Sequence, residues 1–170
     1  MIKAVEEAVI LLRQQTAGGP AVFAEEAERR RYTPTALKAY LGIVDRWALS
    51  GAQAAALLAV STSTWERIKR NADKAAALNQ DQLTRLSALI GIYKGLHLLF
   101  ADDLADRWTG LANRGALFGG QTPIDSMIEG TMTRMEAEAY RLELMDERKA
   151  FVVSNDEMFR VRTRNANNLL

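Results

Sequence analysis

Apolar residues recur at helical spacing along almost the whole chain. Val5, Ala8, Val9 and Leu12, for example, follow the i, i+3, i+4, i+7 pattern of one helix face. Read in this way, the pattern predicts helices over residues 2–15, 21–31, 33–47, 50–58, 61–71, 81–100, 101–115 and 123–128, and a last one that resumes after Gly130 and runs to about 148.

Polar residues set the predicted ends of these helices. Thr33 can cap a new helix with Pro34 at its first position, after a preceding helix that ends in the cations Arg29, Arg30 and Arg31. Ser50 with Gln53 has the spacing of a capping box, and Ser61 marks the next start. These signals favour several short helices rather than a few long ones.

The exception is the stretch from Asp81 to Phe100, in which apolar residues recur at alternating steps of three and four. The face consists of Leu83, Leu86, Ile90, Tyr93, His97 and Phe100, and further leucines and isoleucines flank it. Because this stripe is broader than one neighbouring helix needs, it indicates either a buried helix or the seam of a dimer. Residues 151–170 differ from the rest, since they are β-prone at first and polar at the end.

Composition restricts the chemistry that the chain can perform. Of its 170 residues, 48% are hydrophobic and 25% charged, as in a folded globular protein. No Cys is present and His97 is the single histidine, so the sequence predicts no metal site, no catalytic residue and no cofactor. No apolar run is long enough for a membrane span, and Glu6 interrupts the first apolar stretch, unlike a signal peptide. We therefore expect a cytoplasmic protein that is not an enzyme.

The net charge of +1 conceals a gradient along the chain. Residues 1–75 contain 11 Lys and Arg against 8 Asp and Glu, whereas residues 76–170 contain 11 against 13. Contact with a polyanion is therefore expected in the first half.

The segment from residue 50 to residue 71 has the pattern of a helix-turn-helix. Two short helices are joined by a tight turn, with small Ala55 at the expected crossing and Ala59 where a turn glycine is usual. Val60 and Trp65 would be the buried anchors. Their burial leaves an outward face that could bind DNA, made of Ser61, Thr62, Ser63, Glu66, Arg67 and Arg70. A helical hairpin with a merely solvated outer face is the alternative interpretation.

Three further motifs favour structural interpretations. The acidic "DDLAD" at residues 102–106 has a spacing used to hold magnesium, but we expect a solvated helix face. His97 has no obvious acidic partner in the sequence and is expected to be a packed side chain. Gly119 and Gly120 precede a helix start but lack a P-loop lysine, so a fixed turn that packs Leu117 and Phe118 is favoured over phosphate binding.

Two stretches resemble a known family. "LSGAQAAALLAVSTSTWERIKR" at residues 49–70 is similar to the DNA-binding helix-turn-helix of Xre-type proteins. "LFADDLADRWTGLANRGALFGGQTPIDSMIEG" at residues 99–130 resembles the toxin-binding domain of the Xre/MbcA/ParS antitoxin family. The matching pieces are the helix that ends in Trp108, then Asn113, then Phe118 to Ile128, and the resemblance covers roughly residues 35–145.

The resemblance implies an antitoxin of a RES–Xre type II toxin–antitoxin system. Such a protein would neutralise its cognate toxin, here of the NAD-degrading RES type, by direct binding, and would repress its own operon by binding operator DNA. It would be a homodimer within a larger hetero-oligomer with the toxin. The alternative is a stand-alone helix-turn-helix regulator whose C-terminal half dimerises or senses a ligand.

The expected fold is all-α. A helix-turn-helix bundle over residues 1–75 would be joined by a long helix, 76–100, to a small helical toxin-binding domain, 101–150, with a tail at 151–170. Arg160, Arg162 and Arg164 would present three cations on one side of an extended tail, either as a solvated terminus or as an arm that enters a partner's pocket. The expected toxin-binding residues are therefore Asn113, Arg114, Phe118, Gly119, Gly120, Arg160, Arg162 and Arg164.

Overall fold

The computed structural model describes residues 23–115 and 117–131, and it contains helices and no strand over these ranges. This confirms the predicted all-α class. In chain order the elements are α2 (Glu26–Arg46), α3 (Gly51–Leu57), α4 (Thr62–Arg70), the 3-10 turn η1 (Ala72–Lys74), α5 (Gln80–Leu99), α6 (Asp102–Trp108), α7 (Pro123–Ser126) and the π-helical turn η2 (Met127–Thr131). The helices predicted over 2–15 and after Gly130, and the β-prone tail, lie outside the described residues.

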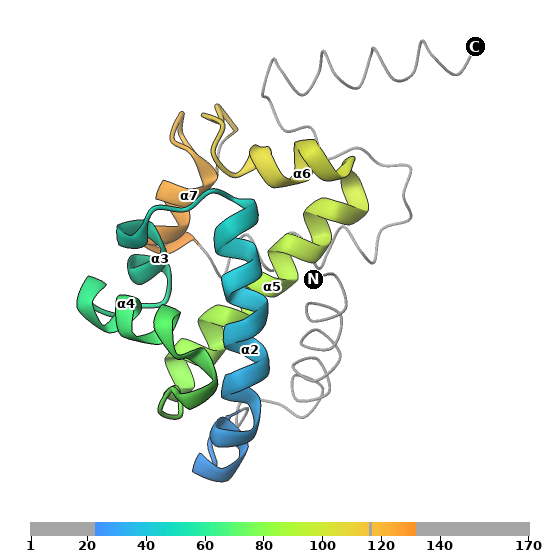
Figure 1. The fold of residues 1–170 in the computed structure, drawn as a ribbon. Helices are drawn as coiled ribbons and strands as arrows, with labels where there is room; N and C mark the ends of the chain where they lie inside the picture. Colours follow the sequence, from blue (N-terminus) through green and yellow to red (C-terminus); the bar gives the residue numbers. More distant parts are fainter. Residues whose placement is uncertain (1–22, 116, 132–170) are drawn as a thin grey trace.

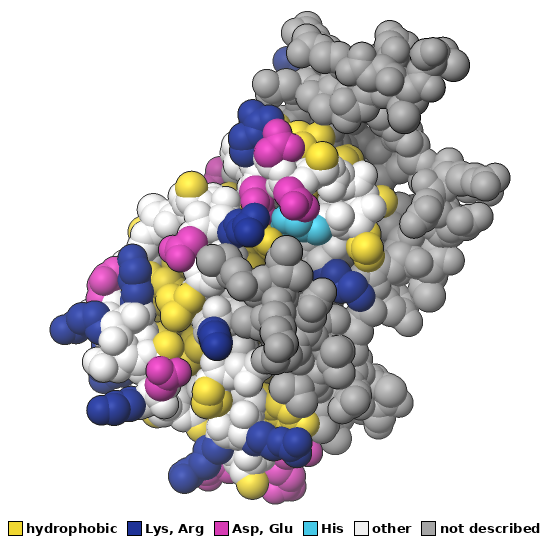
Figure 2. Space-filling view, turned by 45° about the vertical axis from the view of Figure 1, so that its right-hand side comes forward, with side chains coloured by type: hydrophobic (Ala, Val, Ile, Leu, Met, Phe, Trp, Pro, Cys, Tyr) yellow, Lys and Arg dark blue, Asp and Glu magenta, His cyan; other side chains and the backbone are white. Residues whose placement is uncertain are grey.

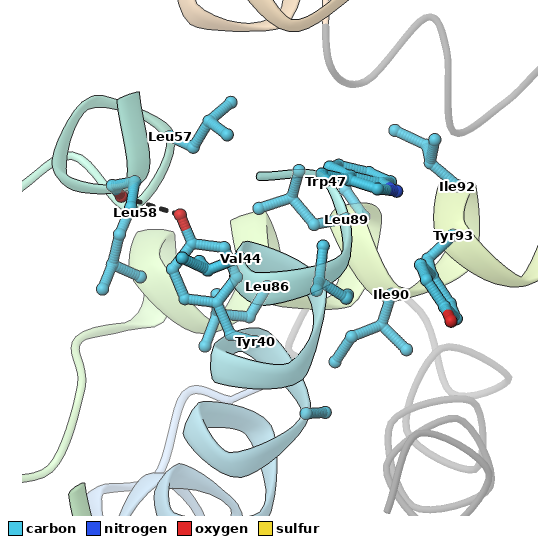
Figure 3. Close-up of a cluster of buried hydrophobic side chains, with 14 of the residues drawn as sticks. Tyr40, Val44, Trp47, Leu57, Leu58, Leu86, Leu89, Ile90, Ile92 and Tyr93 are labelled. Carbon is cyan, nitrogen blue, oxygen red and sulfur yellow. Dashed lines mark hydrogen bonds between the residues drawn. The ribbon is translucent and has the colours of Figure 1, made fainter. Parts of the chain in front are cut away.

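Two long helices form the centre of the molecule. α2 packs along α5, while α3 and α4 lie together on one side and α6 continues from the end of α5 (Figure 1). Figure 3 shows how Tyr40 and Val44 of α2 meet Leu86 and Leu89 of α5, with Leu57 of α3 close by. One cluster of buried side chains extends from Phe23 to Met127, so α6, α7 and η2 share a core with the helix-turn-helix. The division into separate domains stays a prediction.

The predicted face of α5 is buried within the chain. Leu83 and Leu86 have no exposed surface, and Ile90 is 1% exposed. The buried-helix alternative is therefore confirmed from Leu83 to Tyr93, whereas His97 and Phe100 of the same face are half-buried. The dimer seam stays a prediction. In the part of the chain that the structure describes, Leu98 and Leu99 at the end of α5 are the exposed large hydrophobic residues. None of the helices described is long and apolar enough to cross a bilayer.

The predicted helix break at Thr33 and Pro34 is wrong. α2 runs through both residues, and Thr33 is a buried residue of the helix rather than its cap. The Thr33 hydroxyl donates to the Arg29 carbonyl at 2.6 Å and accepts the Leu78 N–H at 3.0 Å. Pro34 removes one backbone donor from the helix, but the buried residues on either side, Tyr32 and Leu37 among them, hold the helix through that position.

The helix predicted over residues 101–115 is also shorter in the structure. Phe100 is extended and separates α5 from α6, which ends at Trp108. Beyond α6, backbone groups pair across a loop instead of along a helix, since the Ile124 N–H donates to the Thr109 carbonyl and the Gly120 N–H to the Asn113 carbonyl. These bonds give the backbone N–H and carbonyl groups of the loop the hydrogen-bond partners that they would otherwise have had within a helix.

An ionic cluster ties three helices together where α2 ends. Asp106 of α6 accepts a hydrogen bond from Arg46 of α2 at 3.0 Å, and its other carboxylate oxygen lies 3.2 Å from Nε2 of His97 on α5. The Asp106 hydrogen bond raises the pKa of Arg46. Figure 2 shows the histidine, in cyan, beside acidic and basic side chains. His97 is a packed, half-buried side chain, as expected, and Asp106 on the next helix is an acidic neighbour that the sequence did not reveal.

Two alanines end helices in the left-handed conformation that usually requires glycine. Ala48 has φ 50° after α2, and Ala59 has φ 55° in the turn between α3 and α4. Around Ala59, the Val60 N–H donates to the Ala55 carbonyl and the Ala59 N–H to the Ala56 carbonyl, the bonds of a Schellman motif.

Replacing Ala59 with glycine is expected to stabilise the protein. The left-handed conformation costs an L-residue about 1–2 kcal/mol, and part of this gain is offset by the larger backbone entropy of glycine in the unfolded chain. We expect Ala59→Gly to raise the free energy of unfolding in urea by about 0.5–1 kcal/mol. The matched control is Ala56→Gly, at an exposed position within α3. This change should lower the free energy of unfolding by about 1 kcal/mol. If both variants lower the free energy of unfolding equally, Ala59 does not have the left-handed conformation described here.

Candidate nucleic-acid interface

α3 and α4 are held in place by a pair of buried aromatic rings. Trp65 of α4 is 1% exposed and meets Tyr40 of α2 edge-to-face, with ring centroids 5.4 Å apart. The Tyr40 hydroxyl donates to the carbonyl of Ala54 in α3 at 2.7 Å (Figure 3). Burial raises the pKa of Tyr40, which keeps this phenol protonated as the donor. One tyrosine thus fixes both helices of the motif relative to α2.

Small residues allow the two helices to cross closely. Ala55 is 2% exposed, as the predicted crossing residue should be. Gly51 is a second such position, which the sequence analysis missed, because a Cβ there would lie 3.8 Å from Trp65 and 3.2 Å from the carboxylate of Glu66. Of the two predicted anchors, Trp65 is buried and Val60 is half-buried against the core.

The outward face of α4 is the one predicted. All six predicted DNA-binding residues are exposed, namely Ser61, Thr62, Ser63, Glu66, Arg67 and Arg70. Ser63, Arg67 and Arg70 are spaced i, i+4, i+7 and therefore form one stripe along the helix. Lys69 is exposed beside them and was not predicted.

The first of these residues also has a structural role. The Ser61 hydroxyl caps α4 by accepting the N–H of Thr64 at 3.2 Å, and it also lies within hydrogen-bond distance of Ser63. The hydroxyl of Thr62, at the first position of the helix, has no such partner in the described part of the chain. Among the described hydroxyls of this turn, that of Thr62 is therefore the one best placed to meet a ligand.

The positive charge of α4 is not neutralised by neighbouring acids. Arg30, Arg85 and Arg107 each pair with a carboxylate four residues earlier in their own helices. Within residues 23–115 and 117–131, the three cations of α4, Arg67, Lys69 and Arg70, have no ion pair. Five cations on other elements also lack one, namely Arg29, Arg31, Lys38, Lys74 and Arg114. Figure 2 shows Lys and Arg side chains along the left edge of the molecule, the side on which Figure 1 places α4. The three cations of α4 are all exposed and lie within four residues of one another, which favours a polyanion as the ligand of this helix.

This arrangement matches what a helix in the major groove needs. A helix of nine residues, capped at its start, presents hydroxyls in its first turn and arginines in its second and third. Hydroxyls and arginines can bond phosphate oxygens, and an arginine can also bond a guanine edge. The first turn of a recognition helix is the part that contacts the bases.

The predicted toxin-binding loop is folded around two of its own predicted contact residues. Asn113 has no exposed surface, and its side-chain oxygen accepts the N–H of Gly115 at 2.8 Å. Phe118 is buried edge-to-face against Trp108. These two residues therefore shape the loop, as the fixed-turn interpretation expected.

The other predicted toxin-binding residues are not buried like Asn113 and Phe118, or lie outside the described residues. Arg114, Gly119 and Gly120 are exposed and supply the surface of the loop, with both glycines at positive φ. Arg160, Arg162 and Arg164 lie outside the described residues. Nothing in the described structure tests whether any of them contacts a toxin.

The acidic motif of α6 does not converge on a common point. Asp102 and Asp103 are exposed, whereas Asp106 is held by Arg46 and His97. No group of three or more acidic or histidine side chains that could hold a metal ion is found among the described residues.

The family model of the antitoxin Xre-like helix-turn-helix domain matches residues 34–91. No curated protein and no solved structure matches the chain. The matched segment contains α3 and α4 complete, with most of α2 before them and the first part of α5 after them. Residues 34–91, which include α4 and its exposed face, are therefore similar to the Xre-like helix-turn-helix domain of antitoxins.

Proposed function

We propose that the chain is the antitoxin of a type II toxin–antitoxin system and that it binds DNA through α4. The observation that carries the proposal is the match of residues 34–91 to the antitoxin Xre-like helix-turn-helix domain. The exposed hydroxyls and unpaired cations of α4 support the DNA-binding part. In this proposal Thr62, Ser63, Glu66, Arg67 and Arg70 contact operator DNA, and Ser61 orients the helix start.

The second activity that we propose is neutralisation of a toxin by direct binding. The toxin would be of the RES type, which degrades NAD. The exposed loop residues Arg114, Gly119 and Gly120 would contribute to the toxin-binding surface, together with Arg160, Arg162 and Arg164. Asn113 and Phe118 would act indirectly by fixing the loop. The chain would have no catalytic residue, because burying the toxin's active site is stoichiometric, and it would act as a cytoplasmic homodimer within a larger complex.

A stand-alone transcriptional regulator is the second candidate. It is favoured by one observation, which is that the family match ends at residue 91 and leaves α6, the loop and α7 without a match. In that case the C-terminal half would serve dimerisation or ligand sensing.

Co-purification separates the two candidates. The chain would be expressed together with the product of the neighbouring gene, tagged on one partner only, and the mass of the eluted complex measured. An antitoxin should elute as a complex of defined stoichiometry and should restore growth of cells that express the toxin. Elution of the chain alone, with no rescue of growth, would contradict the antitoxin proposal and leave the regulator.

A further inference from the structure

In α4 an acid and an arginine with the spacing of an ion pair do not pair with each other. The same holds for Glu25 and Arg29 at the start of α2. Glu66 precedes Arg70 by four residues, the order that favours an ion pair on a helix. Glu26–Arg30, Asp81–Arg85 and Asp103–Arg107 have this spacing and form such pairs. In α4, however, Nε of Arg70 donates to the main-chain carbonyl of Glu66 at 3.2 Å.

The carboxylate of Glu66 is consequently an unused acceptor. It lies against Gly51, where a Cβ would be only 3.2 Å from its Oε1 atom. Among the residues described, it has neither an ion pair nor a hydrogen-bond partner. The side chain is exposed and lies beside the stripe formed by Ser63, Arg67 and Arg70.

Capping of α3 does not account for this carboxylate. The cap is already complete, because the Ser50 hydroxyl accepts the Gln53 N–H at 3.2 Å and the Gln53 side chain accepts the Ser50 N–H at 3.0 Å. Repulsion from phosphates makes an unpaired acid unfavourable on a DNA-binding face unless it meets a hydrogen-bond donor. In the major groove the base donors are the exocyclic amines of cytosine and adenine.

We propose that Glu66 determines sequence specificity by accepting a hydrogen bond from the exocyclic amine of a cytosine in the major groove. Adenine suits a carboxylate less, because its N7 acceptor lies next to its amine and would repel a second acceptor. Arg67, the next residue along α4, is also exposed and has the donors to bond a guanine. This inference rests on the proposed DNA binding and specifies what the recognition helix reads.

Selection from a pool of randomised duplexes tests the inference. The full-length chain and its Glu66→Gln variant would each be taken through the selection, with Asp103→Asn on α6 as the control for loss of an exposed acid. We expect the native chain to select cytosine at one position of each half-site. Glu66→Gln should lose that preference in favour of adenine, since a glutamine amide offers both a donor and an acceptor.

The selected site then gives a quantitative measurement. Replacing the cytosine pair by a thymine–adenine pair should weaken binding by the native chain about 5- to 150-fold. The same replacement should change the affinity of Glu66→Gln less than about twofold. Asp103→Asn should behave as the native chain does.

Three outcomes would overturn an account. If Glu66→Gln keeps the native preference and binds every duplex more tightly, Glu66 only repels the DNA backbone and the inference fails. If it keeps the preference and melts at a lower temperature, the residue is structural and the inference also fails. If the native chain is folded but selects no sequence, it is the proposed DNA binding that fails, and not only the inference about Glu66.

Discussion

Trp65→Ala is expected to lower the free energy of unfolding by about 3–5 kcal/mol, the range found when a large buried aromatic side chain is removed. Trp65 is 1% exposed and lies between Tyr40 of α2 and Gly51 of α3. Its loss would leave a cavity at the point where three helices meet, and α4 has only Ile68 as a second buried side chain. Urea denaturation followed by circular dichroism measures the effect.

The matched control lies two residues away on the opposite side of the same helix. Ser63 is exposed, so Ser63→Ala should change the free energy of unfolding by no more than about 0.5 kcal/mol. A loss below about 1 kcal/mol for Trp65→Ala would mean that the tryptophan does not anchor the motif. In that case the orientation of α4, and with it the proposed reading face, would be wrong.

The second large effect is expected on DNA binding. Arg67 is exposed in the middle of the α4 stripe and has no ion pair in the described part of the chain. A bidentate arginine–guanine contact contributes about 1–3 kcal/mol, so Arg67→Ala should weaken binding to the operator about 5- to 150-fold. Because the side chain is exposed, the free energy of unfolding should change by no more than about 0.5 kcal/mol.

Fluorescence anisotropy of a labelled duplex measures this affinity. Arg107→Ala on α6 is the matched control, because Arg107 is also exposed and its ion pair with Asp103 at 3.9 Å contributes little. Arg67→Ala should leave toxin neutralisation intact, since neutralisation is assigned to another part of the chain. Equal operator affinity of Arg67→Ala and the native chain would show that α4 is not the recognition helix.

Local signals in the sequence predicted most of the helix-turn-helix. The capping box of Ser50 and Gln53, and the start at Ser61, depend on residues three positions apart, and both are found in the structure. The outward face followed from burying Trp65, because helix periodicity then places the other side chains. The exposed residues of α4 could therefore be named before the fold was known.

The errors arose where a distant residue decides the local structure. Thr33 was predicted as a cap, but its hydroxyl bonds the backbone of Leu78, which lies 45 residues further along the chain. The acidic neighbour of His97, Asp106, was not evident in the sequence, because it approaches His97 only where the extended Phe100 separates α5 from α6. Such contacts depend on tertiary packing, which periodicity does not reveal.

The proposed toxin-binding loop shows a third kind of limit. Asn113 and Phe118 were predicted as contact residues from a family resemblance, and the structure buries both of them. Residues of a loop can be characteristic of a family because they fix its shape as well as because they touch a partner. Burial shows that Asn113 and Phe118 fix the shape of the loop, which the sequence could not reveal, while their contact with a toxin stays a prediction.

The most direct test of DNA binding through α4 is a titration of the native chain with the duplex upstream of its own gene at several salt concentrations. We predict tight binding at low salt and a logarithm of the association constant that falls linearly with the logarithm of salt, by about 0.9 for each phosphate contacted. Absence of binding at low salt, by a chain shown to be folded, would contradict the account.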